Sequence, residues 1–137
     1  MADTIRKIDY FALSVPDQPG EAHRVLAALS AAGADLRAFC GFPLGGGKAQ
    51  LDFVPADAAA FTAAAARMKL KVRKPKPAFL IEGDDRVGAV ASVLEKLASQ
   101  KIPITAAQAI SAGAGRWGMI VWVKPSRVDK AARALGV

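Results

Sequence analysis

The sequence predicts an α+β fold made of two similar halves, each a split βαβ unit in which helices cover one face of an antiparallel sheet. Three observations lead to this fold class. The composition, 53% hydrophobic and 23% charged, is that of a packed globular chain and excludes intrinsic disorder. The chain aligns with itself after a shift of 68 residues. Strand-like and helix-like patterns also follow one another in the same order in both halves.

The internal repeat is carried mainly by apolar and glycine positions. The matched pairs are Phe11 with Phe79, Leu13 with Ile81, Asp17 with Asp85, Gly20 with Gly88, Leu26 with Leu94, Leu29 with Leu97, Leu36 with Ile104, Leu51 with Met119 and Phe53 with Val121. A period of about half the chain indicates two copies of one supersecondary unit. We assign residues 1–74 to the first unit and residues 75–137 to the second, and expect the small units to pack on each other.

Each half begins with a strand that leads through a turn into a helix. Alternating apolar residues predict a strand over Tyr10–Val15, and Ala78–Glu82 is its counterpart. An apolar stripe at helical spacing predicts a helix over Gly20–Ala32, and the matching stripe over Val87–Gln100 is clearer.

Two strands joined by a glycine-rich hairpin come next in each half. They are Leu36–Phe42 with Lys48–Val54, and Ile104–Ile110 with Trp117–Val123. The run Gly45-Gly46-Gly47-Lys48 lacks the spacing of a phosphate-binding loop and precedes a strand, so we interpret it as the hairpin turn.

A second helix closes each half. Asp57 is a candidate cap for the first of these helices, and Ser126 with Asp129 resembles a capping box for the second. Lys69–Val72 alternates basic and apolar residues, which predicts a fourth strand for the first unit. The second unit reaches Val137 directly after its helix, so we expect it to lack its last strand. Completion by Thr4–Ile8 is the alternative.

The outer face of the second sheet is also expected to be covered. Ile120 and Trp122 alternate with inward-facing residues and make this face apolar, which predicts burial against a partner surface. We therefore expect the two units to form a pseudo-dimer and the chain to form a homodimer.

The counts of histidine and cysteine argue against catalysis. One His and one Cys cannot supply the ligands of a zinc site without several carboxylates. Cys40 lies in an apolar strand and His23 on the first turn of a helix, and both are better explained by packing or solvation than as a nucleophilic pair. We expect no enzymatic activity, no metal and no cofactor.

The chain is expected to be cytoplasmic. Its longest stretch without a charge is too short and polar to cross a bilayer, and its first residues lack the apolar core of a signal peptide. A single cysteine fits a reducing compartment.

The positive charge is concentrated in the second half. Residues 1–68 carry six Lys/Arg and seven Asp/Glu, whereas residues 69–137 carry thirteen and five. Six of the basic residues cluster at the junction of the halves: Arg67, Lys69, Lys71, Arg73, Lys74 and Lys76. Nucleic-acid binding is therefore the alternative function. It is disfavoured because the basic residues do not interleave with the strand aromatics.

The motif order of the chain resembles the ACT domain. A strand, the turn Asp17-Gln18-Pro19-Gly20, an apolar helix and the entry Gly33-Ala34-Asp35-Leu36 into the next strand carry the resemblance. The second half is similar, with Asp84-Asp85-Arg86-Val87-Gly88 at the turn and Lys101-Ile102-Pro103-Ile104 at the helix exit. The resemblance covers nearly the whole chain. It implies two ferredoxin-like units in tandem, a non-catalytic regulatory role, a free amino acid as ligand and a regulated enzyme as partner.

The chemistry of the turns agrees with a zwitterionic ligand. A glycine lets a ligand approach the backbone, the following helix N-terminus suits a carboxylate, and the turn aspartates suit an ammonium group. Helix capping by Asp17, turn formation by the glycines and solvation of Arg86 are the alternative roles. We expect the ligand where a turn meets the start of a neighbouring copy's second strand, and favour the first turn. The predicted ligand-binding residues are Asp17, Gln18, Pro19, Gly20, Leu36, Arg37, Asp84, Asp85, Arg86, Gly88, Ile104 and Thr105.

Overall fold

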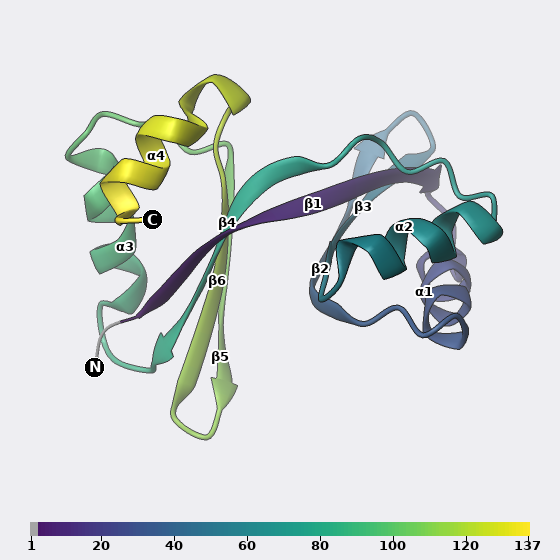
Figure 1. Cartoon of the computed structure of the whole chain (residues 1–137), viewed down its shortest axis with the longest axis horizontal. Coiled ribbons are helices and arrows are strands. Elements are labelled where there is room, and N and C mark those ends of the chain that lie inside the picture. Colours follow the sequence, from purple (N-terminus) through teal and green to yellow (C-terminus); the bar gives the residue numbers. More distant parts are fainter. Residues whose placement is uncertain (1–2) are drawn as a thin grey trace. The chain divides into compact units, whose positions relative to one another are not determined.

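The computed structural model describes residues 3–137, which divide into two compact units (Figure 1). The first unit is Asp9–Lys76. The second unit combines Pro77–Val137 with the N-terminal segment that ends at Ile8. The expected α+β class with a tandem of similar units is confirmed. The division differs from the expected one at the N-terminus, because the segment up to Ile8 belongs with the second unit.

The first unit has the predicted order of elements. They are β1 (Thr4–Pro16), α1 (Glu21–Ala31), β2 (Leu36–Gly45), β3 (Lys48–Pro55) and α2 (Ala58–Arg67). The strand order is β2-β3-β1, and β3 runs antiparallel to both neighbours. The rings of Phe11 on β1, Phe53 on β3 and Phe61 on α2 pack together, with centroids 4.8 and 5.5 Å from that of Phe61. The helices therefore cover the sheet face that carries these aromatic side chains.

The segment that follows α2 is not the predicted fourth strand. Residues 70–75 have no strand conformation, although Leu70 and Val72 pack against the core of the first unit as their alternation predicts. The N–H of Arg73 donates to the carbonyl of Ala12 at 2.9 Å. In a ladder every second N–H points to the same neighbour, so the next donor along the chain would be Pro75, which has no N–H. Pro75 therefore removes one donor that an extension of this pairing along the chain would need.

The second unit repeats the same order. Its elements are β4 (Lys76–Asp84), α3 (Ala89–Ala98), β5 (Ala106–Gly113), β6 (Arg116–Trp122), a single 3-10 turn η1 (Pro125–Arg127) and α4 (Val128–Leu135). The strand order is β4-β6-β5, and all neighbours are antiparallel. Residues of β4, α3, β6 and α4 form one buried core, which includes Phe79, Val93, Val121 and Leu135.

The N-terminal part of β1 completes the sheet of the second unit. No strand follows α4 in the described chain, as expected, and β1 lies beside β4 instead. Ile5 packs against the core of this unit, and the guanidinium of Arg6 forms an ion pair with Glu82. The alternative in which Thr4–Ile8 supplies the missing strand is therefore confirmed.

The starts of the two closing helices differ. The Oδ1 atom of Asp57 accepts hydrogen bonds from the N–H groups of Ala59 and Ala60 at 3.0 and 3.2 Å, so the predicted cap of α2 is confirmed. The capping box predicted from Ser126 and Asp129 is wrong, because α4 has no side-chain cap. Pro125 sets a 3-10 turn that leads directly into α4.

Ile120 and Trp122, which make the outer face of β6 apolar, are each only 7% exposed within the single chain. The expectation that a partner surface covers this face stays a prediction. No helix of the described residues is long and apolar enough to span a membrane.

Candidate functional site

The two turns predicted to bind ligand have the same backbone geometry. Gly20 has a φ of 89° and directly precedes α1, and Gly88 has a φ of 85° and directly precedes α3. A Cβ at either position would meet no atom within 4 Å, so the left-handed conformation rather than crowding requires glycine. Neither helix has a side-chain cap. Capping by Asp17 is therefore excluded, and the helix N-termini offer N–H groups to an anion.

Each turn is held by the hairpin of its own unit. The N–H of Asp17 donates to the carbonyl of Gly47 at 2.9 Å, and the N–H of Asp85 donates to that of Gly115 at 2.8 Å. Both contacts are related by the 68-residue shift. The turn geometry is therefore retained although Val87 replaces the proline of the first turn.

A cavity of about 260 Å³ lies at the second turn, between the start of α3 and the end of β5. Its polar lining consists of Asp85, Arg86 and Ser111, and its apolar lining includes Ile110 and Trp117. Ser111 Oγ donates to Asp85 Oδ2 at 2.8 Å. This hydrogen bond orients the carboxylate of Asp85 at the cavity.

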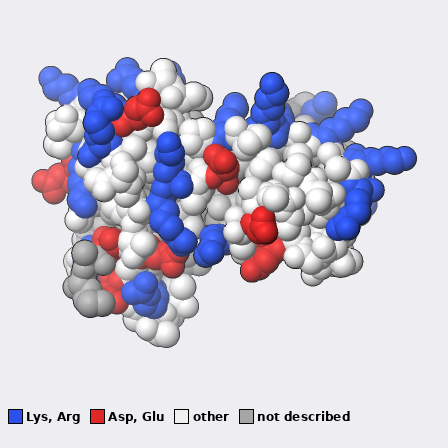
Figure 2. All heavy atoms as spheres, viewed as in Figure 1, with Lys and Arg blue, Asp and Glu red and all other residues white. Residues whose placement is uncertain are grey.

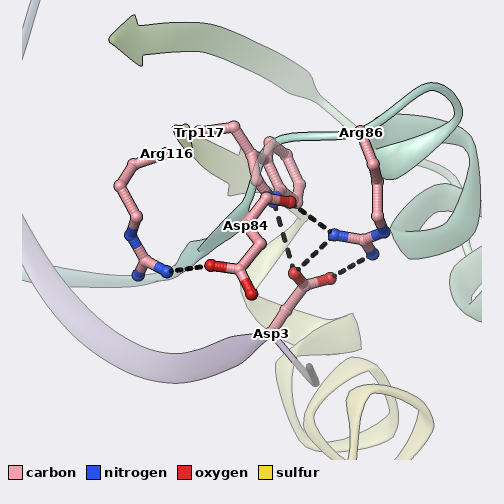
Figure 3. Close-up of polar contacts among 5 residues, drawn as sticks. All are labelled: Asp3, Asp84, Arg86, Arg116 and Trp117. Atoms are coloured by element: carbon pink, nitrogen blue, oxygen red, sulfur yellow. Dashed lines mark hydrogen bonds and ion pairs between the residues drawn. The ribbon is translucent and has the colours of Figure 1, made fainter. Parts of the chain in front are cut away.

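Arg86 is held by a carboxylate from the N-terminal segment (Figure 3). Its Nη1 and Nη2 atoms donate to Asp3 Oδ1 and Oδ2 at 3.0 and 2.9 Å, and Nη1 also donates to the carbonyl of Asp84 at 2.9 Å. Trp117 Nε1 donates to Asp3 Oδ1 at 3.2 Å. These hydrogen bonds, those from Arg86 first, hold the pKa of the Asp3 carboxyl below its usual value. The same contact with Asp3 raises the pKa of Arg86.

The structure brings only part of the predicted residues together. Asp85, Arg86 and Gly88 line the cavity, whereas the carboxylate of Asp84 accepts a hydrogen bond from Arg116 Nη1 at 2.9 Å. Asp17, Gln18, Pro19 and Gly20 are exposed at the equivalent turn of the first unit.

The starts of the second strands lie away from the turns of their own units. Leu36 pairs with Pro55, whereas the first turn adjoins the opposite end of β3, near Lys48. Arg37 is exposed beside Leu36. In the second unit the N–H of Thr105 donates to the carbonyl of Trp122 at 2.8 Å, and Ile104 is exposed. These four residues therefore do not meet the turn within their own unit.

The site contains residues that the sequence analysis missed. No sequence motif marks the following residues as part of a site: Asp3, Ile110, Ser111 and Trp117. The repeat nevertheless offers a signal for two of them. The 68-residue shift aligns Trp117 with Ala49 and Ser111 with Pro43, so the second unit has a large aromatic and a polar side chain where the first unit has neither. The described residues contain no group of three His, Cys, Asp or Glu that could hold a metal ion.

No protein-family model and no curated protein sequence matches the chain. Its fold is similar to that of a protein from Bacteroides thetaiotaomicron, with 18% identity, a TM-score of 0.78 and coverage of 98% of this chain and 88% of that chain. It is also similar to the ligand-free regulatory subunit of aspartate kinase from Thermus thermophilus, with 18% identity, a TM-score of 0.64 and coverage of 98% and 94%. The regulatory subunit of aspartate kinase from Thermus flavus gives 19% identity, a TM-score of 0.60 and coverage of 99% and 95%. These likenesses show the tandem ACT-like fold that the sequence predicts.

Proposed function

We propose that this chain is a non-catalytic regulatory protein that binds a free amino acid. The observation that carries the proposal is the cavity at the second turn. It combines a carboxylate, an uncapped helix N-terminus and an apolar wall. The fold that it shares with regulatory subunits of aspartate kinase supports the same role.

The cavity offers a separate partner for each part of an amino acid. The N–H groups at the start of α3 suit the ligand carboxylate, because a helix N-terminus carries unpaired donors and a positive partial charge. Asp85 suits the ammonium group, since a carboxylate has further lone pairs beside the one that Ser111 occupies. The cavity volume of about 260 Å³ is several times what one water molecule needs, so it has room for a small organic molecule.

The apolar wall favours an apolar side chain. Val90, Ile110 and Trp117 line the cavity, and the first two are exposed to solvent at its rim. A ligand side chain that covers them removes apolar surface from water and gains binding free energy. We therefore propose that the ligand is an apolar amino acid.

The first turn is proposed as a second binding position, completed by another copy of the chain. Its backbone matches that of the second turn, but Leu36 and Arg37 of the same unit lie at the far end of β3 and β2. A neighbouring copy that brings its own Leu36 and Arg37 to the turn Asp17–Gly20 would close the site. This proposal requires a homodimer. We further propose that the chain acts in the cytoplasm and that its regulated partner is an enzyme.

A thermal-shift screen of the twenty amino acids at millimolar concentration tests the proposal. A ligand at 100 times its Kd adds about 2.7 kcal/mol of stability, which corresponds to a rise of roughly 5–15 °C in Tm. We expect the apolar amino acids to give the largest rise. No shift from any amino acid would contradict the proposal.

Two variants of neighbouring aspartates locate the site. Asp85→Asn removes the anionic partner of the ammonium group and is expected to weaken binding about tenfold or more. Asp84→Asn is the matched control, since this carboxylate lies on the same turn but is paired with Arg116 outside the cavity. Equal loss in both variants would place the ligand elsewhere.

Nucleic-acid binding is a second candidate function, favoured by a basic surface. Lys96 on α3 with Lys130 and Arg133 on α4 line an open cavity of about 490 Å³. Figure 2 shows Lys and Arg side chains gathered over this helical side of the second unit. Oligonucleotide binding whose logarithmic affinity falls with a salt slope of about −0.9 for each phosphate contact would favour this function. Binding that is insensitive to salt would exclude it.

A further inference from the structure

Arg86 has two roles in the geometry of the second unit. It lines the candidate amino-acid cavity, and both of its terminal nitrogens are bonded to the carboxylate of Asp3 (Figure 3). This bidentate geometry is the one in which guanidinium groups commonly bind carboxylates, and a ligand carboxylate would use the same donors. Asp3 therefore occupies the donors that a carboxylate ligand in the cavity would otherwise use.

The position of Asp3 is built into the unit. Its side chain is only 7% exposed, and Trp117 Nε1 supplies a third N–H donor. A Cβ on Gly83 would lie 1.9 Å from Asp3 Oδ1 and 2.9 Å from Trp117 Nε1. The carboxylate thus fills the space beside β4 that a side chain at position 83 would need.

The N-terminal segment has other attachments to the same unit. Ile5 packs against the core, and Arg6 forms an ion pair with Glu82. Both contacts follow Asp3 in the chain and lie outside the cavity. The carboxylate of Asp3 can therefore leave Arg86 while β1 stays in the sheet.

We propose that Asp3 is an internal competitor for Arg86, which lowers the affinity of the second-turn cavity for carboxylates until Asp3 leaves. The inference rests on the proposed amino-acid site and names its regulation. While Asp3 is bound, the guanidinium is neutralised and Asp85 supplies the remaining charge at the cavity. After Asp3 leaves, the cavity gains a cation that can bind a ligand carboxylate. The apparent affinity is then reduced by the fraction of molecules in which Arg86 is released.

The availability of Arg86 can be measured without any amino acid. Phenylglyoxal reacts with accessible arginine side chains, and mass spectrometry of the peptide that contains Arg86 gives the rate. We expect Asp3→Asn and Asp3→Ser to raise this rate about tenfold, because the guanidinium then has no carboxylate of Asp3 to hold it. Arg116, paired with Asp84 in the same unit, is the internal reference whose rate stays unchanged. An unchanged rate at Arg86 in the two variants, each verified as folded by circular dichroism, would overturn the proposal.

Arg6→Met is the matched control. It removes the other ion pair between the N-terminal segment and β4 without touching Arg86. We expect the Arg86 rate of this variant to equal that of the wild type. A rise as large as that in Asp3→Asn would show that strand release, and not the Asp3 carboxylate, controls Arg86, and would also overturn the proposal.

Protection by L-leucine tests the proposed function separately. In Asp3→Asn we expect L-leucine to bind about tenfold more tightly than in the wild type and to slow the modification of Arg86. Tighter binding supports competition by Asp3, and equal binding in the two proteins contradicts it. Absence of L-leucine binding in both proteins, with the rate difference present, contradicts L-leucine as a ligand of the site and leaves the control of Arg86 by Asp3 supported.

Discussion

In both units a strand leads into a helix through a turn that ends in a left-handed glycine, Gly20 in the first and Gly88 in the second. In both units the N–H of the turn aspartate, Asp17 or Asp85, donates to a carbonyl of the hairpin. The surroundings differ. At the positions of Arg86, Ser111 and Trp117 the first unit has Gln18, Pro43 and Ala49. The two turns therefore share a backbone and differ in every polar side chain that could orient a ligand, except the aspartate.

This comparison separates two kinds of information in the repeat. The glycine and the hairpin contact set the path of the chain, since they act through φ and through backbone hydrogen bonds. The side chains at three other positions supply part of the lining of the cavity at the second turn. A motif such as Asp-x-Pro-Gly therefore predicts the backbone path of the turn, but it does not predict which side chains line a cavity beside that turn.

The largest effect is expected from adding a side chain at position 83 of β4, where the first unit has one and the second unit has glycine. Position 83 corresponds to Val15 in the first unit. Gly83→Ala places a Cβ 1.9 Å from Asp3 Oδ1, so we expect a loss of about 1–3 kcal/mol in the free energy of unfolding. Urea denaturation measures this loss. Gly118→Ala on the adjacent strand is the control, because its Cβ would meet only a carbonyl at 3.7 Å.

A double-mutant cycle sharpens this prediction. If the cost of Gly83→Ala comes from displacing Asp3, it is smaller in an Asp3→Gly background, apart from the remaining contact with Trp117 Nε1. Additive losses in the cycle would mean that Gly83 is required for another reason.

The second prediction concerns the pH dependence that only the second turn should have. Asp3 has a lowered pKa in the folded chain, chiefly through its hydrogen bonds with Arg86. Its contribution to stability is therefore complete above the usual carboxyl pKa and is lost as the pH falls through the lowered value. We expect Asp3→Asn to lower the unfolding free energy by about 1 kcal/mol at neutral pH and to have no effect in strong acid. Thermal denaturation across this range measures the difference, and a constant difference down to strong acid would contradict the ion-pair assignment.

The smallest effect is expected at the helix exits. Gly33 has a φ of 79° and its counterpart Lys101 has a φ of 56°. The following N–H donates to an equivalent carbonyl in both units, Ala34 to Leu29 and Ile102 to Leu97. A lysine is strained in this conformation, so Lys101→Gly should raise the unfolding free energy by about 0.5–1 kcal/mol. The reverse substitution, Gly33→Lys, should lower the unfolding free energy by a similar amount. Urea denaturation measures both changes. A change of the same sign in the two variants would contradict the structural equivalence of positions 33 and 101.

The sequence by itself determined the local elements and their repetition. Alternation at Phe11 and Phe79, helical stripes ending at Leu29 and Leu97, and the hairpin glycines each depend on neighbours a few residues away, and the 68-residue shift shows that both halves use them alike. The cap by Asp57 was predictable for the same reason, because its donors are Ala59 and Ala60. Such features depend on backbone conformation and local hydrogen bonds, which the residue types limit directly.

Only the tertiary structure decided which strand fills which edge and what surrounds the second turn. Lys69–Val72 alternates basic and apolar residues and yet forms no strand, whereas Thr4–Ile8, without such a pattern, completes the sheet of the second unit. Asp3 is 83 residues from Arg86 and 114 residues from Trp117 in sequence. Contacts at such separations arise from the pairing of β1 with β4, and no local pattern of residue types reports that pairing. The fold class could therefore be predicted, while the carboxylate at the candidate site could not.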